Sequence, residues 1–154
     1  MILADAAATE AMGARLAGVV TGGDAIALVG ELGAGKTTLV SGLVAALGGG
    51  AAHSPTFSLV HEYRDGRLIV WHVDLYRIER AAELPELGLD DVVGDRRGIV
   101  VVEWADRFDV LPIDHLVLEL RHTATARELV ATGTGPRGTA LAREIDPAAT
   151  PVLG

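Results

Sequence analysis

Residues 30–37 read Gly-Glu-Leu-Gly-Ala-Gly-Lys-Thr, a full G-x-x-x-x-G-K-[ST] phosphate-binding loop, and this stretch decides the fold. An apolar run at 25–29 precedes the loop, and a helix-like stretch at 38–47 follows it. Strand, glycine-rich loop and helix in this order form the context in which such a loop binds phosphate. Its backbone N–H groups surround phosphate oxygens beside a helix N-terminus that carries partial positive charge. The segment therefore predicts a nucleoside triphosphate site.

Two side chains of this loop have predicted tasks of their own. Lys36 is the only lysine among the 13 Lys and Arg residues, and its compact ammonium suits the outer phosphates. The Thr37 hydroxyl is placed to bind Mg²⁺. The nucleotide-binding residues predicted from this segment are Glu31, Leu32, Gly33, Ala34, Gly35, Lys36, Thr37 and Thr38.

Two acidic residues follow the ends of apolar runs, and such positions face a bound nucleotide in α/β sheets. Glu103 comes directly after the β-branched run 99–102 and is predicted to be a Mg²⁺ ligand with a catalytic role. Asp74 ends the run 68–73 and is the second predicted catalytic residue. It could orient the attacking water or hold Mg²⁺ through a water molecule. Ser54-Pro55-Thr56 reads either as a switch that senses the γ-phosphate or as an ordinary turn before proline.

Composition sets the class of protein. The chain has 154 residues, 49% hydrophobic, and no cysteine, which predicts one globular domain without disulfides. We expect a P-loop domain over 1–145 and a flexible tail over 146–154. The start of the chain lacks the pattern of a signal peptide, and no apolar run is long enough to span a bilayer, so a cytoplasmic location is expected. The net charge of −8 argues against autonomous nucleic-acid binding.

The remaining patterns predict an α/β, P-loop NTPase-like three-layer fold with a mixed parallel and antiparallel central sheet. Residues 5–20 form an amphipathic helix by periodicity, and 79–87 form a short acidic helix. A polar turn at 64–67 with Asp-Gly at its centre predicts a hairpin between 57–63 and 68–75. The segments 115–121 and 127–132 predict a further antiparallel pair, whereas residues beyond 133 carry little signal.

Residue types that the chain lacks narrow its function. Without asparagine, and with its one lysine inside the phosphate loop, the chain has no N/T-K-x-D motif for guanine. It also has no glutamine to position a water molecule, and no LSGGQ signature. An ATPase or a small kinase remains. The five histidines lack the i,i+4 spacing and the cysteine partners of a structural zinc site.

The ordered set of motifs resembles one family, the ATPase subunit of bacterial tRNA threonylcarbamoyladenosine biosynthesis, known as TsaE and formerly YjeE. The resemblance covers roughly residues 5–133. The phosphate loop alone occurs in many ATPases, whereas the later motifs are more specific in combination. The matching stretches are GELGAGKTT at 30–38, SPTFSLV at 54–60, HVDLYR at 72–77, ELGL at 86–89 and VVEW at 101–104.

This resemblance implies Mg²⁺-dependent ATP binding and slow hydrolysis in service of N⁶-threonylcarbamoyladenosine, formed at adenosine 37 of tRNAs that read codons beginning with A. It implies two partners, a glycoprotease-like transferase subunit and its paralogue, through which tRNA is mainly contacted. The acidic charge agrees with that division of labour. By position, Thr37 and Glu103 match Mg²⁺ ligands, Asp74 a residue required for hydrolysis, and Arg127 and Thr9 nucleotide-contacting positions, Thr9 on the adenine side. The 79–87 helix is expected to face a partner.

Two other functions stay open on the residues. A small-molecule kinase would need several arginines in a lid over ATP, and Arg77, Arg80, Arg96 and Arg97 are the candidates. A nucleotide-sensing scaffold would use the acidic residues only to position Mg²⁺. The early hairpin fits a kinase poorly.

Overall fold

Parallel strands with apolar side chains on both faces form the middle of the sheet. The computed structural model describes residues 1–50 and 59–149. Its strands are β1 (Ile2–Leu3), β2 (Ala25–Gly30), β3 (Val60–Tyr63), β4 (Ile69–Asp74), β5 (Gly98–Glu103), β6 (His115–His122) and β7 (Arg127–Thr134). Its helices are α1 (Ala6–Ala17), α2 (Lys36–Ala46), the 3₁₀ helix η1 (Ala81–Leu87), α3 (Leu89–Val92) and α4 (Gly135–Ile145).

The seven strands form one sheet in the order β1-β7-β6-β2-β5-β4-β3. The pairs β6–β2, β2–β5 and β5–β4 are parallel, whereas β3, β7 and β1 pair antiparallel at the two sides. The predicted mixed sheet is therefore confirmed, as are both predicted antiparallel pairs. Residues 57 and 58 of the predicted hairpin lie outside the described residues.

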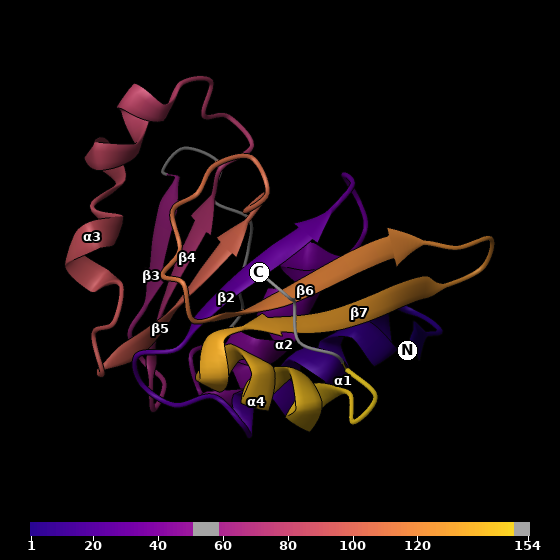
Figure 1. Cartoon of the computed structure of the whole chain (residues 1–154). Helices are drawn as coiled ribbons and strands as arrows, with labels where there is room; N and C mark the ends of the chain where they lie inside the picture. The colour runs from indigo at the N-terminus through magenta and orange to yellow at the C-terminus, as the bar shows by residue number, and fades with distance from the viewer. Residues whose placement is uncertain (51–58, 150–154) are drawn as a thin grey trace.

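Helices cover both faces of the sheet, but unequally. Figure 1 shows α1, α2 and α4 below the sheet and α3 beside its β3–β5 half. Side chains from α1, α2 and α4 join Leu28, Val101 and Leu118 in the larger hydrophobic core. On the other face, Trp71 and Val100 pack with residues of η1, α3 and the segment after β5. The three-layer arrangement follows from these two cores, because alternate residues of β4 and β5 enter opposite ones.

Several boundaries differ from those predicted. The first helix ends at Ala17, and α2 begins at Lys36, inside the phosphate loop itself. The predicted helix at 79–87 is a 3₁₀ helix over Ala81–Leu87 with Pro85 inside it. The helix α4 was not predicted; it buries Leu141, Ala142 and Ile145 against β6 and β7. The expected tail is described only as far as residue 149, and 150–154 lie outside the described residues.

Across residues 1–50 and 59–149, the structure contains no helix with the length and apolarity of a membrane span.

The helices α1 and α2 approach each other so closely that only glycine fits at two crossing positions. A Cβ atom at Gly13 would lie 2.1 Å from the Leu39 carbonyl oxygen, and one at Gly42 would lie 2.0 Å from the Glu10 carbonyl oxygen. Real side chains do not approach a backbone oxygen so closely, so substitution at either glycine must force the helices apart. Since α2 begins at the phosphate loop, this contact also fixes the loop against α1.

We expect Gly42→Ala to lower the free energy of unfolding by about 2 kcal/mol or more, because overpacking a backbone contact costs energy in a tightly packed core. Urea unfolding followed by circular dichroism measures this. Ala14→Ser, at an exposed position of α1, is the control and should change stability by less than about 0.5 kcal/mol. Equal midpoints for the two variants would contradict the close contact.

Candidate functional site

The phosphate loop connects the carboxyl end of β2 to the first turn of α2. Gly35 precedes the helix with φ of 106°, a left-handed conformation that favours glycine. The Ala34 N–H donates to the Glu31 carbonyl at 3.1 Å and tightens the turn. The first N–H groups of a helix lack partners within it, so the start of α2 presents donors to an anion.

Lys36 lies almost fully within the loop, with 5% of its surface exposed. Its Nζ donates to the carbonyl oxygens of Gly30 at 2.6 Å and Glu31 at 2.8 Å, and it lies 4.2 Å from the centre of the Trp104 ring. Burial lowers the pKa of the Lys36 ammonium, while the nearby carboxylates, that of Glu103 foremost, oppose this effect. The ammonium is therefore held at the mouth of the loop by carbonyl groups and an aromatic face.

Thr37, in the first turn of α2, lies beside Glu103 at the carboxyl end of β5. The parallel register sets Leu28 of β2 beside Glu103 of β5, so the last residue of β5 reaches the phosphate loop. The Thr37 hydroxyl lies 3.3 Å from Glu103 Oε1 and 3.4 Å from Oε2. Glu103 is 3% exposed and keeps its carboxylate inside the site. These two side chains, predicted as metal ligands, are brought together.

Asp74 lies next to Glu103, because the register of β4 and β5 aligns these two residues. It is half-buried, and its Oδ1 accepts a hydrogen bond from the Tyr76 N–H at 2.9 Å. Burial raises the pKa of the Asp74 carboxyl, and the negative charge of Glu103 raises it further. The Tyr76 N–H opposes this rise. Two carboxylates thus face the same hollow as the lysine.

The residues at this place fit Mg²⁺. The oxygen donors are the Thr37 hydroxyl and the Glu103 carboxylate, with Asp74 beside them, and hard cations prefer oxygen. In the described part of the chain, no group of three or more His, Cys, Asp or Glu side chains is arranged to hold a metal ion. Proteins commonly hold Mg²⁺ through one or two side chains together with substrate phosphates.

The hollow that Lys36, Asp74 and Glu103 line has a volume of about 190 Å³. A second hollow, of about 220 Å³, adjoins it, because both are lined by Gly33, Gly35 and Thr38. Thr9 lines it from α1, where its methyl group would lie 3.4 Å from a Cβ at Gly35. Arg127 lines it from β7, and its Nη2 donates to the Gly33 carbonyl at 3.3 Å. The structure therefore places both residues, far apart in sequence, beside the phosphate loop.

Two residues near the site were given no functional role in the sequence analysis. Asp5 lines the second hollow and begins α1, where its Oδ1 accepts the Ala8 N–H at 2.8 Å; an acidic residue before an apolar-periodic run is a recognisable helix start. His72 is fully buried, and its Nε2 lies 2.5 Å from Glu103 Oε2. No spacing pattern in the sequence predicts the contact between His72 and Glu103.

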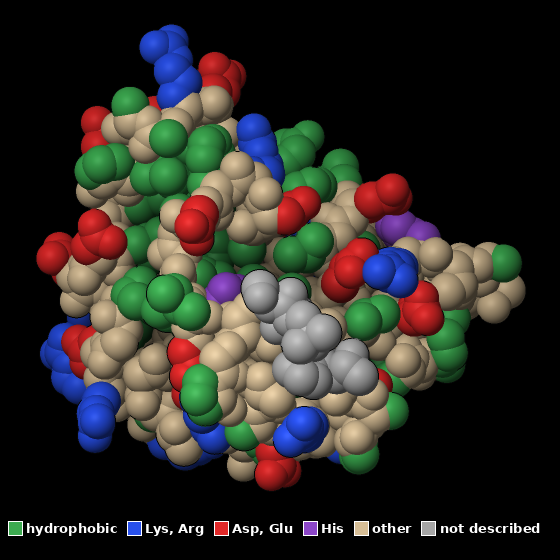
Figure 2. Space-filling model, in the orientation of Figure 1, with side chains coloured by type: hydrophobic (Ala, Val, Ile, Leu, Met, Phe, Trp, Pro, Cys, Tyr) green, Lys and Arg blue, Asp and Glu red, His purple; other side chains and the backbone are tan. Residues whose placement is uncertain are grey.

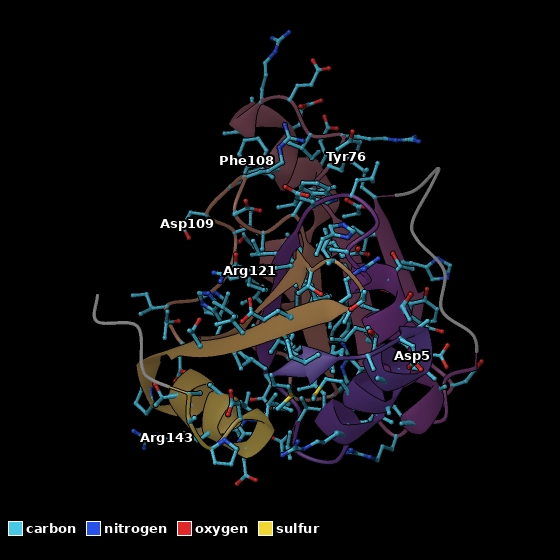
Figure 3. All side chains as sticks on the ribbon, turned by 90° about the vertical axis from the view of Figure 1, so that its right-hand side faces the viewer. Asp5, Tyr76, Phe108, Asp109, Arg121 and Arg143 are labelled. Carbon is cyan, nitrogen blue, oxygen red and sulfur yellow. The ribbon has the colours of Figure 1, made fainter. Side chains whose placement is uncertain are left out.

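Aromatic side chains border the site on the loops after β4 and β5. Trp104 has φ of 58°, unusual for a non-glycine residue, and its ring centre lies 5.0 Å from that of Tyr76. Arg107 donates to the carbonyl groups of Leu75 and Tyr76 and so joins the two loops. Figure 3 labels Tyr76 and Phe108 in the upper part of the view, with Asp5 well below them at the start of α1.

Two of the arginines considered for a kinase lid do not lie with the site. Arg96 and Arg97 directly precede β5 and therefore lie at the opposite end of this strand from Glu103. There, Arg97 forms an ion pair with Asp95 at 2.7 Å. They are not placed to form a lid over the phosphate loop. Ser54-Pro55-Thr56 lies outside the described residues.

A larger hollow, of about 650 Å³, lies elsewhere. It lies between η1, α3 and residues 109–112, where Leu84 and Leu111 line it together with Asp90, Asp91 and Asp109. Figure 2 shows hydrophobic side chains gathered with acidic ones over this upper left region. None of the described residues that line it is basic, and the helices beside it have only seven and four residues, so the candidate phosphate site is placed at the phosphate loop.

We expect Asp74→Asn to raise the free energy of unfolding at pH 8 by about 0.5–1 kcal/mol. Because folding raises the pKa of this carboxyl, its ionised form costs stability above the raised pKa. The gain should shrink as the pH falls and vanish below about 3.9, where Asp is protonated in both states. Urea unfolding between pH 4 and 8 tests this, with exposed Asp109→Asn as the control. A gain that does not depend on pH would contradict the assigned cause.

Comparisons with known proteins point to one family. The family model described as "Threonylcarbamoyl adenosine biosynthesis protein TsaE" matches residues 3–129. A Bacillus subtilis protein named "tRNA threonylcarbamoyladenosine biosynthesis protein TsaE" is 36% identical over 140 residues, which cover 89% of this chain and 87% of that protein. Its namesake from Streptomyces coelicolor is 39% identical over 137 residues, or 82% and 90% of the two chains.

The fold is also that of a solved relative. The crystal structure of Bacillus subtilis YdiB superposes with a TM-score of 0.77 at 29% identity, and the match covers 96% of this chain and 93% of that one. Family model, relatives and fold agree over most of the chain. The chain belongs to the TsaE family.

Proposed function

We propose that this chain is the ATP-binding, slowly ATP-hydrolysing accessory subunit of tRNA N⁶-threonylcarbamoyladenosine synthesis. The observation that carries the ATPase part is the meeting of Thr37 and Glu103 at 3.3 Å beside Lys36 in a complete phosphate loop. The pathway rests on family membership, since relatives over most of the chain are named for threonylcarbamoyladenosine biosynthesis. Adenosine 37 of tRNAs that read codons beginning with A is the proposed target.

Each side chain has a proposed role. Lys36 and the N–H groups of the loop bind the β- and γ-phosphates, and Thr37 with Glu103 holds Mg²⁺, which when bound neutralises phosphate charge. Asp74 orients the water that attacks the γ-phosphorus as the bond to the ADP oxygen breaks. The adenosine occupies the second hollow, between Thr9 and Arg127.

The partners proposed are a glycoprotease-like transferase subunit and its paralogue, with tRNA held mainly by them. The net charge of −8 argues against autonomous RNA binding by this chain. Described arginines near the sheet edges are partly committed to carboxylates, as in Arg97–Asp95 and Arg121–Glu119. A subunit regulated in this way is expected to hydrolyse ATP slowly when it is alone.

Substitutions should separate binding from turnover. We expect Lys36→Ala to weaken ATP binding about 100-fold, because it removes hydrogen bonds to a charged group worth roughly 2–3 kcal/mol. Asp74→Asn should keep ATP affinity within about 3-fold and slow hydrolysis about 100-fold or more. Calorimetric titration and phosphate release measure the two effects. Arg64→Ala, an exposed position on the far hairpin, is the matched control and should leave both unchanged. Equal losses of affinity and turnover in Asp74→Asn would reverse its assignment.

The whole function is tested by Mg²⁺-ATP hydrolysis with and without the two partner subunits. We expect turnover to be slow for the chain alone and to rise at least about 10-fold when both partners and tRNA are present. Formation of the modified base in the reconstituted mixture should require the chain. Brisk turnover that the partners do not change would contradict the accessory role, and transfer of phosphate to a small molecule would indicate a kinase.

A further inference from the structure

His72 occupies a core position of β4 on the same sheet face as the acidic residues of the site. Side chains alternate along a strand, so His72 and Asp74 share one face while Trp71 and Val73 enter the opposite core. His72 has 0% of its surface exposed, and the register pairs it with Val101 of β5. The imidazole therefore lies two residues before the Asp74–Glu103 pair along the strands, farther from their carboxyl ends.

The carboxylate of Glu103 bends back toward this imidazole. Its Oε2 lies 2.5 Å from His72 Nε2, while Thr37 lies within 3.4 Å of both carboxylate oxygens. The ring tautomer that donates from Nε2 gives the carboxylate a charge-assisted hydrogen bond inside the protein. Glu103 is thus held from both sides, by an imidazole below and a hydroxyl above.

This contact is not a favourable way to fill a core position. The other ring nitrogen, Nδ1, is buried and has no hydrogen-bond partner among the described residues. A buried polar atom without a partner costs free energy, and an apolar side chain would avoid that cost. A histidine at this position, in spite of that cost, points to the contact that it does make, with Glu103.

We infer that His72 is a positioning residue that holds Glu103 in the orientation required to bind Mg²⁺ beside the nucleotide. The inference rests on the proposed function, in which Glu103 is a Mg²⁺ ligand. A glutamate side chain is long and flexible, and near the sheet edge it could rotate toward water. The Nε2 bond fixes Oε2 and leaves Oε1 directed at Thr37. Hydrogen bonds to metal ligands of this kind commonly change metal affinity by about 10–100-fold.

The test is calorimetric titration of the full-length protein with ADP, in Mg²⁺ and in EDTA, for variants of His72. The informative quantity is the ratio of the two dissociation constants, because damage to the fold weakens both equally. We expect His72→Leu to reduce the gain in affinity from Mg²⁺ at least about 10-fold. His72→Gln, whose amide nitrogen can reach the place of Nε2, should keep that gain within about 3-fold of wild type.

His72→Asn keeps the test decisive if the leucine variant does not fold. Its shorter amide reproduces Nδ1 rather than Nε2, so it should lose the Mg²⁺ gain that His72→Gln retains. His115→Gln, which changes a partly buried histidine at the start of β6, is the matched control and should behave as wild type.

Two results would overturn the inference. One is a wild-type Mg²⁺ gain in His72→Leu or His72→Asn; the other is an equal loss of ADP affinity with and without Mg²⁺, which would make His72 merely structural. Glu103→Gln separates this from a failure of the proposed function. If Glu103→Gln itself keeps the full Mg²⁺ gain, the metal assignment fails, and His72 has no ligand to position.

Discussion

The parallel register of β2, β5 and β4 is the constraint on which the rest of the site depends. It sets Leu28 beside Glu103 and Glu103 beside Asp74, so the carboxyl ends of these three strands lie together next to the phosphate loop. A shift by one residue would turn Glu103 to the opposite face, because side chains alternate along a strand. The apolar residues that precede each acidic residue enforce the register, since each must reach its own core.

Buried charge is the cost of this arrangement. Among the described residues, Lys36, His72 and Glu103 are buried polar groups at the site. Each occupies interior space that an apolar side chain could fill. Carbonyl groups, the Trp104 ring and hydrogen bonds compensate in part. Two hydrophobic cores and the tight crossing of α1 and α2 supply the stability that the site itself does not. The close helix crossing also limits how far the loop can move.

Most of the sheet could be predicted because its signals are local. The phosphate loop, the Asp-Gly turn and the apolar runs each predict an element from neighbouring residues alone, and β2, β4, β5, β6 and β7 agree with their predicted ranges within about two residues. The strand β3 begins at Val60 instead of residue 57, and residues 57 and 58 lie outside the described residues. The helix α4 was not predicted because its sequence begins with Gly-Pro, which is typical of a turn. Its row of buried apolar residues is also short and consists of Leu141, Ala142 and Ile145. The strand β1 was missed because two residues carry no period, and it exists only by pairing with β7.

The sequence by itself determined the chemistry of phosphate binding, because one loop holds the glycines, Lys36 and Thr37 within eight residues. It also determined which acidic residues end strands. Only the tertiary structure decided which side chains support them. Thr9 and Arg127 reach the loop from α1 and β7, and His72 contacts Glu103 across 31 positions of the chain. Strand order and the orientation of each side chain set those contacts, and neither is a property of any short stretch of sequence.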